Sequence, residues 1–203
     1  ETLAQSSQTG KVSIITHSNG GLVAKRLIQK LEAAGKAGLI DKVIMVAAPQ
    51  LGTPKAAYSM LHGYDQELFL GIFSSKSVAR ELGAHMPGAY QLLPSQKYFD
   101  TVLDPVVTFD SSIDSFSNLR RTYGSSITNV SALSNFLTAK NDRRTFGASD
   151  DILKPIVLMN GLLSKATALH NSLDTMTFPS DIKVTEIAGW GLDTIRGIRY
   201  EEQ

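Results

Sequence analysis

The chain contains no cysteine. Without thiols, these residues form neither a disulfide nor a metal–thiolate centre, although the compartment stays open because secreted bacterial enzymes often lack cysteine too. No run of eighteen apolar residues is present, so the sequence predicts no membrane-spanning segment. Charge of one sign is not in excess either, because 20 Lys and Arg against 19 Asp and Glu give a formal net charge of +1.

The basic residues are scattered along the chain. Two adjacent pairs, Arg120-Arg121 and Arg143-Arg144, are expected to be solvated loop charges. Nucleic-acid binding needs a clustered basic stripe, so nucleic acid is excluded as a partner. A chain of 203 residues, 42% of them hydrophobic, is long enough to bury a substantial core and is expected to form one structural domain.

What the sequence does contain is a β-rich apolar run that stops at a short polar turn and restarts as an amphipathic helix. The run is Val12–Thr16, the turn is His17–Asn19, and the helix is predicted over about 20–34. Ser18 lies at the apex of this turn. A strand, a sharp turn and a helix with serine at the tip are the geometry of the nucleophile elbow of α/β-hydrolases.

Such a turn places the serine backbone in a strained conformation, so the residues two before and two after it have to be small. Gly20 meets this requirement, whereas Thr16 stands where the commonest pattern has a glycine and crowds the turn more. The alternative interpretation is an ordinary strand-to-helix turn in which Ser and Asn act as helix caps.

A second strand is predicted at 41–48 and completes a strand–helix–strand unit with parallel strands. Its mostly apolar sequence predicts burial on both faces of a parallel sheet. Farther along, apolar residues at three- and four-residue steps predict a long helix over 150–176 that packs on the sheet. A last strand is predicted at 182–188.

Two further stretches, Ala47–Pro54 and Met86–Ser95, follow Thr16–Gly21 along the chain. With these three stretches in this order, the chain resembles serine lipases and acyltransferases of the lecithin:cholesterol acyltransferase-like group of α/β-hydrolases. The resemblance extends to Lys183–Leu192. It implies an α/β architecture, a partial α/β-hydrolase fold of parallel strands with flanking helices and a mainly helical cap. The implied division is core at 1–54 with the elbow, cap at 55–149 and core at 150–203, together one domain incomplete at both ends.

The cap is expected to contain short helices at 56–62, 66–73, 77–82 and 131–140. Its apolar residues either line a channel for acyl chains or, as is more common at helical spacing, fill the core. These residues are Leu61, Leu68, Phe69, Leu70, Ile72, Phe73, Phe136 and Leu137.

For the site, the resemblance implies that Ser18 is the catalytic nucleophile and that the backbone amide of Asn19 is an oxyanion donor. The same resemblance makes four neighbours structural residues of the elbow: Thr16, His17, Gly20 and Gly21. The side chain of His17 is expected to point away from Ser18, because a general base has to approach from across the site.

The remaining members of a catalytic triad are expected outside this chain. Hydrolases of this kind carry the order Ser, acid, His, yet no histidine follows His170. Asp193 is a weak candidate for the acid. His62 and His85 are expected to be surface or hydrogen-bonded histidines, and the spacing of His170 and Asp174 suits a local hydrogen bond. No metal ligand set and no organic cofactor are indicated.

The function predicted from the sequence is a serine-dependent lipase or esterase that acts on lipid-like carboxylic esters through an acyl-enzyme intermediate. An acyltransferase of the same fold is the nearest variant, and a non-catalytic module that binds lipid or a protein is the alternative from another class. The expected partners are a lipid or ester substrate and the remainder of the protein's own chain. A secreted or cell-envelope location fits but is not determined, and this span alone is expected to be inactive.

Overall fold

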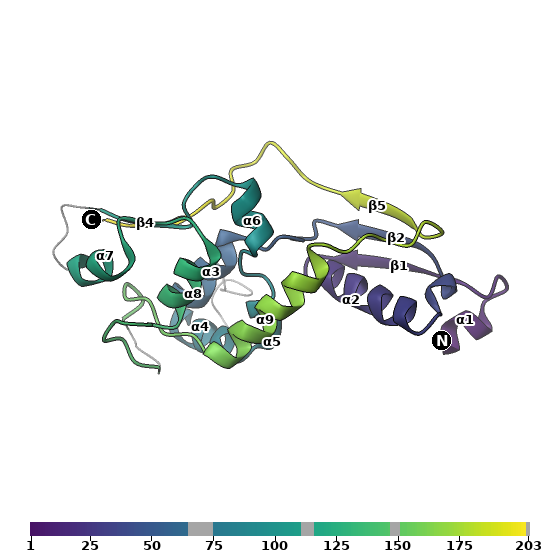
Figure 1. Cartoon of the computed structure of the whole chain (residues 1–203), viewed down its shortest axis with the longest axis horizontal. Coiled ribbons are helices and arrows are strands. Elements are labelled where there is room, and N and C mark those ends of the chain that lie inside the picture. The colour runs from purple at the N-terminus through teal and green to yellow at the C-terminus, as the bar shows by residue number, and fades with distance from the viewer. Residues whose placement is uncertain (65–74, 111–115, 147–150, 202–203) are drawn as a thin grey trace. The chain divides into compact units, whose positions relative to one another are not determined.

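The computed structural model of the chain describes residues 1–64, 75–110, 116–146 and 151–201. The chain forms two compact units, coloured along the sequence in Figure 1. Unit 1 consists of residues 1–50 and 171–193, and unit 2 of residues 51–170 and 194–203. The predicted division at 54 and 149 stays a prediction.

Unit 1 contains a parallel sheet of three strands in the order β1-β2-β5. The strands are β1 (Val12–His17), β2 (Ile40–Val46) and β5 (Lys183–Ile187). Helix α2 (Gly20–Ala33) connects β1 to β2 through the short 3-10 turn η1 (Ala37–Leu39), so the predicted strand–helix–strand unit is confirmed. The predicted last strand is also confirmed, since β5 pairs in parallel with β2.

Burial of the sheet corrects one prediction. Along β2, Val43 and Met45 are buried against α2, whereas Ile44 and Val46 on the other face are only half-buried. On that same face Ile15 of β1 is 72% exposed. Within unit 1 the second strand is therefore buried on one face, because its α2 side is the side that packs into the core; an apolar sequence could not distinguish one covered face from two.

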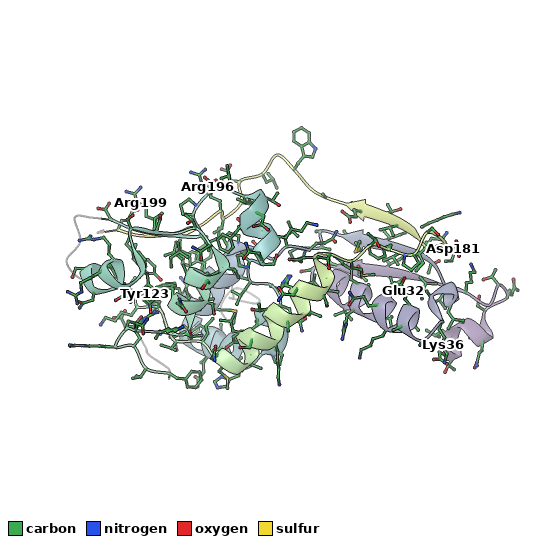
Figure 2. All side chains as sticks on the ribbon, in the orientation of Figure 1. Glu32, Lys36, Tyr123, Asp181, Arg196 and Arg199 are labelled. Atoms are coloured by element: carbon green, nitrogen blue, oxygen red, sulfur yellow. The ribbon has the colours of Figure 1, made fainter. Side chains whose placement is uncertain are left out.

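Helix α2 is amphipathic, and its Ala24 and Ile28 pack with Val43 and Met45 of the sheet. The helix preceding β1 is α1 (Thr2–Ser6). Lys36, labelled in Figure 2, forms an ion pair of 2.8 Å with Glu1 of that segment, and both side chains are about half exposed. Exposed pairs of this kind stabilise a fold little.

Unit 2 is mainly helical. Its helices are α3 (Pro54–His62), α4 (Lys76–His85), α5 (Pro87–Tyr90), α6 (Gln96–Thr101), α7 (Ser117–Tyr123), α8 (Val130–Leu137) and most of α9 (Asn160–Leu173). The helices predicted at 56–62, 77–82 and 131–140 correspond to α3, α4 and α8. The helix predicted at 66–73 and the apolar residues within it lie outside the described residues.

A small sheet in unit 2 was not predicted. Its strands are β3 (Val107–Phe109), β4 (Ser126–Ile127) and β6 (Ile198–Tyr200), with β4 antiparallel and β6 parallel to β3. Strands of two or three residues carry almost no periodic signal, and the pairing of β3 with β6 joins segments about ninety residues apart. The sequence therefore offered little by which to find it.

The core of unit 2 decides the role of several predicted cap residues. Leu61, Phe136 and Leu137 are all 1% exposed or less and belong to one buried cluster. They are core residues, so the channel-lining interpretation is wrong for these three. An aromatic group on the small sheet completes the cluster, in which Tyr200 stacks on Phe109 with ring centroids 5.3 Å apart.

The long helix predicted over 150–176 is only Asn160–Leu173. The residue before Pro155 is disfavoured in helical conformation, and the backbone beyond it bonds to other elements instead of to itself. Ile156 N–H donates to Leu61 O and Leu158 N–H donates to Leu137 O. Leu163 and Ala166 of this helix lie in the core of unit 2.

Candidate functional site

Ser18 lies between the last residue of β1 and the start of α2, and its backbone has φ +53°. This left-handed conformation is uncommon for a residue with a side chain and is maintained by surrounding structure. Ser18 N–H donates to Val46 O at 3.0 Å, and Ser18 O accepts from Gly21 N–H at 3.0 Å. The side chain is half-buried and not enclosed.

The residues around this turn are close enough that their size matters. A Cβ added to Gly20 would lie 3.2 Å from Thr16 Cβ, and one added to Gly21 would lie 2.5 Å from Ala48 Cβ. The second distance is shorter than real Cβ atoms show, so a side chain at position 21 would push the loop after β2 away from α2. Thr16 is accommodated with its hydroxyl 3.4 Å from Ile44 O.

Asn19 is the residue at which α2 begins. Its carbonyl accepts from Leu22 N–H at 3.0 Å and from Val23 N–H at 3.3 Å, which starts the helical hydrogen-bonding pattern. The first turn of α2 contains no acidic residue, so the partial positive charge of this helix end is not offset from within its own first turn. Ser18 is thus adjacent to a helix N-terminus, an environment that favours developing negative charge.

The loop after β2 contains a second strained residue. Ala47 has φ +47°, and its N–H donates to Ile187 O of β5 at 2.8 Å. Ser18 and Ala47 each follow the end of a strand, and each donates to the neighbouring strand in the order β1-β2-β5. Both departures from regular backbone therefore occur at the carboxyl edge of this sheet.

Two of the sequence stretches singled out above meet in unit 2. Thr53 N–H donates to Leu92 O at 2.8 Å, and Ser95 N–H donates to Leu51 O at 2.9 Å. Gly52, the residue between Leu51 and Thr53, has a left-handed backbone with φ +80°. The segments 51–54 and 92–95 are thus hydrogen-bonded to each other, although forty residues separate them.

The histidines lie in different surroundings. His17 is exposed at the end of β1. His85 is exposed, with Nδ1 2.8 Å from Glu81 O, and His170 is buried with Nε2 2.8 Å from Gln91 O. His62 is buried, and its Nδ1 and Nε2 lie 2.7 Å from Ile152 O and 2.8 Å from Tyr200 Oη. The hydrogen-bonding contacts of His62, His85 and His170 are typical of histidines with a structural role.

Burial lowers the pKa of His62 below its ordinary value of 6.5. Arg80 and Arg144 lower this pKa further, whereas the Ile152 carbonyl and Asp151 act in the opposite direction. Because the Ile152 carbonyl can only accept, Nδ1 carries the proton and Nε2 accepts from the Tyr200 hydroxyl. The imidazole is neutral in the folded protein near neutral pH.

Because of His62, the free energy of unfolding is expected to fall on acidification. Below pH 6.5 the unfolded chain binds a proton at His62 that the folded chain does not, so the free energy of unfolding decreases as pH drops from 6.5 towards the lower, folded pKa. The slope is at most about 1.4 kcal/mol per pH unit. Urea unfolding between pH 7 and 5 measures it. His62→Gln retains hydrogen-bonding groups and should lose this contribution to the slope; an unchanged slope would contradict the assignment.

Other candidate groups are dispersed. Asp193 is exposed, in a segment after β5 where Trp190 and Leu192 are 95% and 87% exposed.

In the ranges that the structure describes, no group of three or more His, Asp or Glu side chains is suited to hold a metal ion. Within the same ranges, no helix is both long and apolar enough to cross a membrane. A cavity of about 170 Å³ lies in unit 2, lined by Arg80, His85 and Phe146 among others, and Ser18 is not among its lining residues.

The fold is that of α/β-hydrolases, in which parallel strands are flanked by helices. A chain of the solved structure titled "The crystal structure of Tle4-Tli4 complex" matches with a TM-score of 0.51 and 18% sequence identity. The match covers 86% of this chain and 35% of that chain, so this chain spans about a third of the length of that chain.

The family is more specific than the fold. The model of the lecithin:cholesterol acyltransferase family matches residues 1–203, and the chain belongs to this family. The resemblance inferred from the three sequence stretches is thereby confirmed. A search of curated proteins gave no match.

Proposed function

We propose that the protein is a serine-dependent hydrolase of lipid-like carboxylic esters and that Ser18 is its nucleophile. The single observation that carries the proposal is the left-handed backbone of Ser18, φ +53°, between β1 and α2 in a chain of this family. A strained serine at a strand-to-helix turn presents its Oγ at the edge of the sheet, where substrate can approach. An ordinary helix cap requires no such strain.

The chemistry follows from this placement. Ser18 Oγ attacks the ester carbonyl carbon, and the carbonyl oxygen becomes an oxyanion. The backbone amide of Asn19, the first after the nucleophile, is proposed as one donor to that oxyanion, supported by the positive end of α2. The ester C–O bond then breaks, the alcohol leaves with the serine proton, and an acyl-enzyme remains. Water releases the acid and restores Ser18.

His17 shares the turn and is exposed at the end of β1, which supports a structural role. Asp193 stays a candidate for the acid. The family description favours a second candidate function: if an acceptor alcohol rather than water attacks the acyl-enzyme, the same site is an acyltransferase.

A fluorophosphonate probe tests the proposal directly, since it labels an activated serine and leaves ordinary hydroxyls unmodified. In the whole protein that contains residues 1–203, we expect one label, located by peptide mass spectrometry at Ser18. Ser18→Ala should abolish labelling, whereas Ser13→Ala should not, because Ser13 is an exposed serine on the same strand. Folded protein without any label would contradict the proposal and favour a non-catalytic binding module.

A further inference from the structure

Helix α2 carries one basic residue on its buried side. Lys25 is 6% exposed, whereas its neighbours Arg26 and Lys30 are exposed. Burying an ammonium group is costly unless it is paired by hydrogen bonds and charge. Lys25 Nζ donates to Gln50 Oε1 at 3.2 Å, so the lysine reaches from the helix to the loop after β2.

The contact continues to the next strand. Gln50 Nε2 donates to Glu186 Oε1 of β5. A glutamine is suited to the middle of such a chain, because its amide oxygen faces the cation and its amide nitrogen faces the carboxylate. We call Lys25, Gln50 and Glu186 the bridge. It joins three segments of unit 1 that are far apart in sequence: α2, the loop after β2, and β5.

The bridge lies beside the strained residues. Glu186 is in register with Met45, and Met45 is in register with Thr16, so these three residues form one row across the sheet on its α2 side. Thr16 is two residues before Ser18, and Glu186 is next to Ile187, whose carbonyl accepts from Ala47. The loop 47–50 is thus attached at its first residue by its backbone and at its last by the bridge.

We infer that Lys25, Gln50 and Glu186 are positioning residues that hold the loop 47–50 and α2 in place beside Ser18. Stability alone is a poor reason for this arrangement, because Glu186 is exposed and the hydrogen bond from Gln50 to Glu186 lies at the surface, where charged and polar contacts stabilise a fold little. Directional bonds fix geometry instead, and small displacements of reacting groups reduce rates strongly. The inference rests on the proposed role of Ser18.

A charge exchange tests the bridge. In Lys25→Glu and in Glu186→Lys, the two ends carry like charges, and we expect kcat for a short acyl ester to fall about ten-fold or more, with KM changed less than about three-fold. In the double variant the charges are opposite again. Rotating the Gln50 amide by half a turn restores both hydrogen bonds, so kcat should return to within about three-fold of the original protein.

Controls separate the possible outcomes. Lys30→Glu makes the same charge change on the exposed side of α2 and should leave kcat unchanged. If a charged variant does not fold, Gln50→Met removes both bonds without adding a charge, and the rate of fluorophosphonate labelling per folded molecule should fall likewise. Full activity in the single variants, or no recovery in a folded double variant, overturns the bridge while Ser18 stands. Absence of labelling in the unsubstituted protein overturns both.

Discussion

Replacing Ser18 by Ala is expected to reduce ester turnover by at least about a thousand-fold, because the residue that forms the acyl-enzyme is lost. The substitution removes one oxygen and keeps Cβ, so the left-handed backbone, φ +53°, is as strained in the variant as in the original protein. The free energy of unfolding should therefore change by less than about 1 kcal/mol. Hydrolysis of short acyl esters and urea unfolding measure the two quantities.

The comparison with Ser13→Ala makes this prediction specific. Ser13 is exposed on β1, five residues before Ser18, and its loss should affect neither turnover nor stability. Ester hydrolysis retained by folded Ser18→Ala protein would refute the nucleophile. Loss of turnover together with loss of folding would instead show that the hydroxyl is structural, which the half-buried position of this side chain argues against.

Replacing Gly52 by Ala is expected to destabilise unit 2 by more than about 3 kcal/mol. Gly52 has φ +80°, which a residue with a side chain rarely adopts. An added Cβ would lie 2.1 Å from Leu93 O and 2.8 Å from Pro94 N. Both neighbours are backbone atoms, so relieving the overlap requires separating segments 51–54 and 92–95, which are joined by two hydrogen bonds.

Gly38→Ala is the matched control for this prediction. Nothing lies within 4 Å of a Cβ added at Gly38, and its backbone is not left-handed, so its free energy of unfolding should change by about 0.5 kcal/mol or less. Urea unfolding compares the two variants. A loss below about 1 kcal/mol in Gly52→Ala would mean that the two segments separate easily and that their contact contributes little to the fold.

The elements of unit 1 could be predicted from the sequence because their signals are local. Hydrophobic periodicity predicted β1, α2, β2 and β5 to within one or two residues, and glycines flanking a polar turn predicted where the chain bends at Ser18. The family could be predicted for the same reason, since its three stretches are short and continuous in sequence.

Predictions that depended on distant contacts were less successful. The long helix predicted from 150 begins at Asn160, because the backbone of Ile156 and Leu158 bonds to Leu61 and Leu137. Likewise Leu61, Phe136 and Leu137 have the same apolar pattern whether they line a channel or fill a core, and burial alone decides for the core. The bridge was also missed, because Lys25 resembles the exposed basic residues that surround it in sequence.

The amino-acid sequence is sufficient to predict the strand–turn–helix around Ser18 and the family, since both depend on residues that are neighbours along the chain. Tertiary structure alone decides which face of the sheet is buried, which apolar residues form the core of unit 2, and that Lys25 reaches Glu186 through Gln50. The physical reason is that burial and side-chain pairing depend on which distant segments fold against each other, and periodicity does not encode that choice.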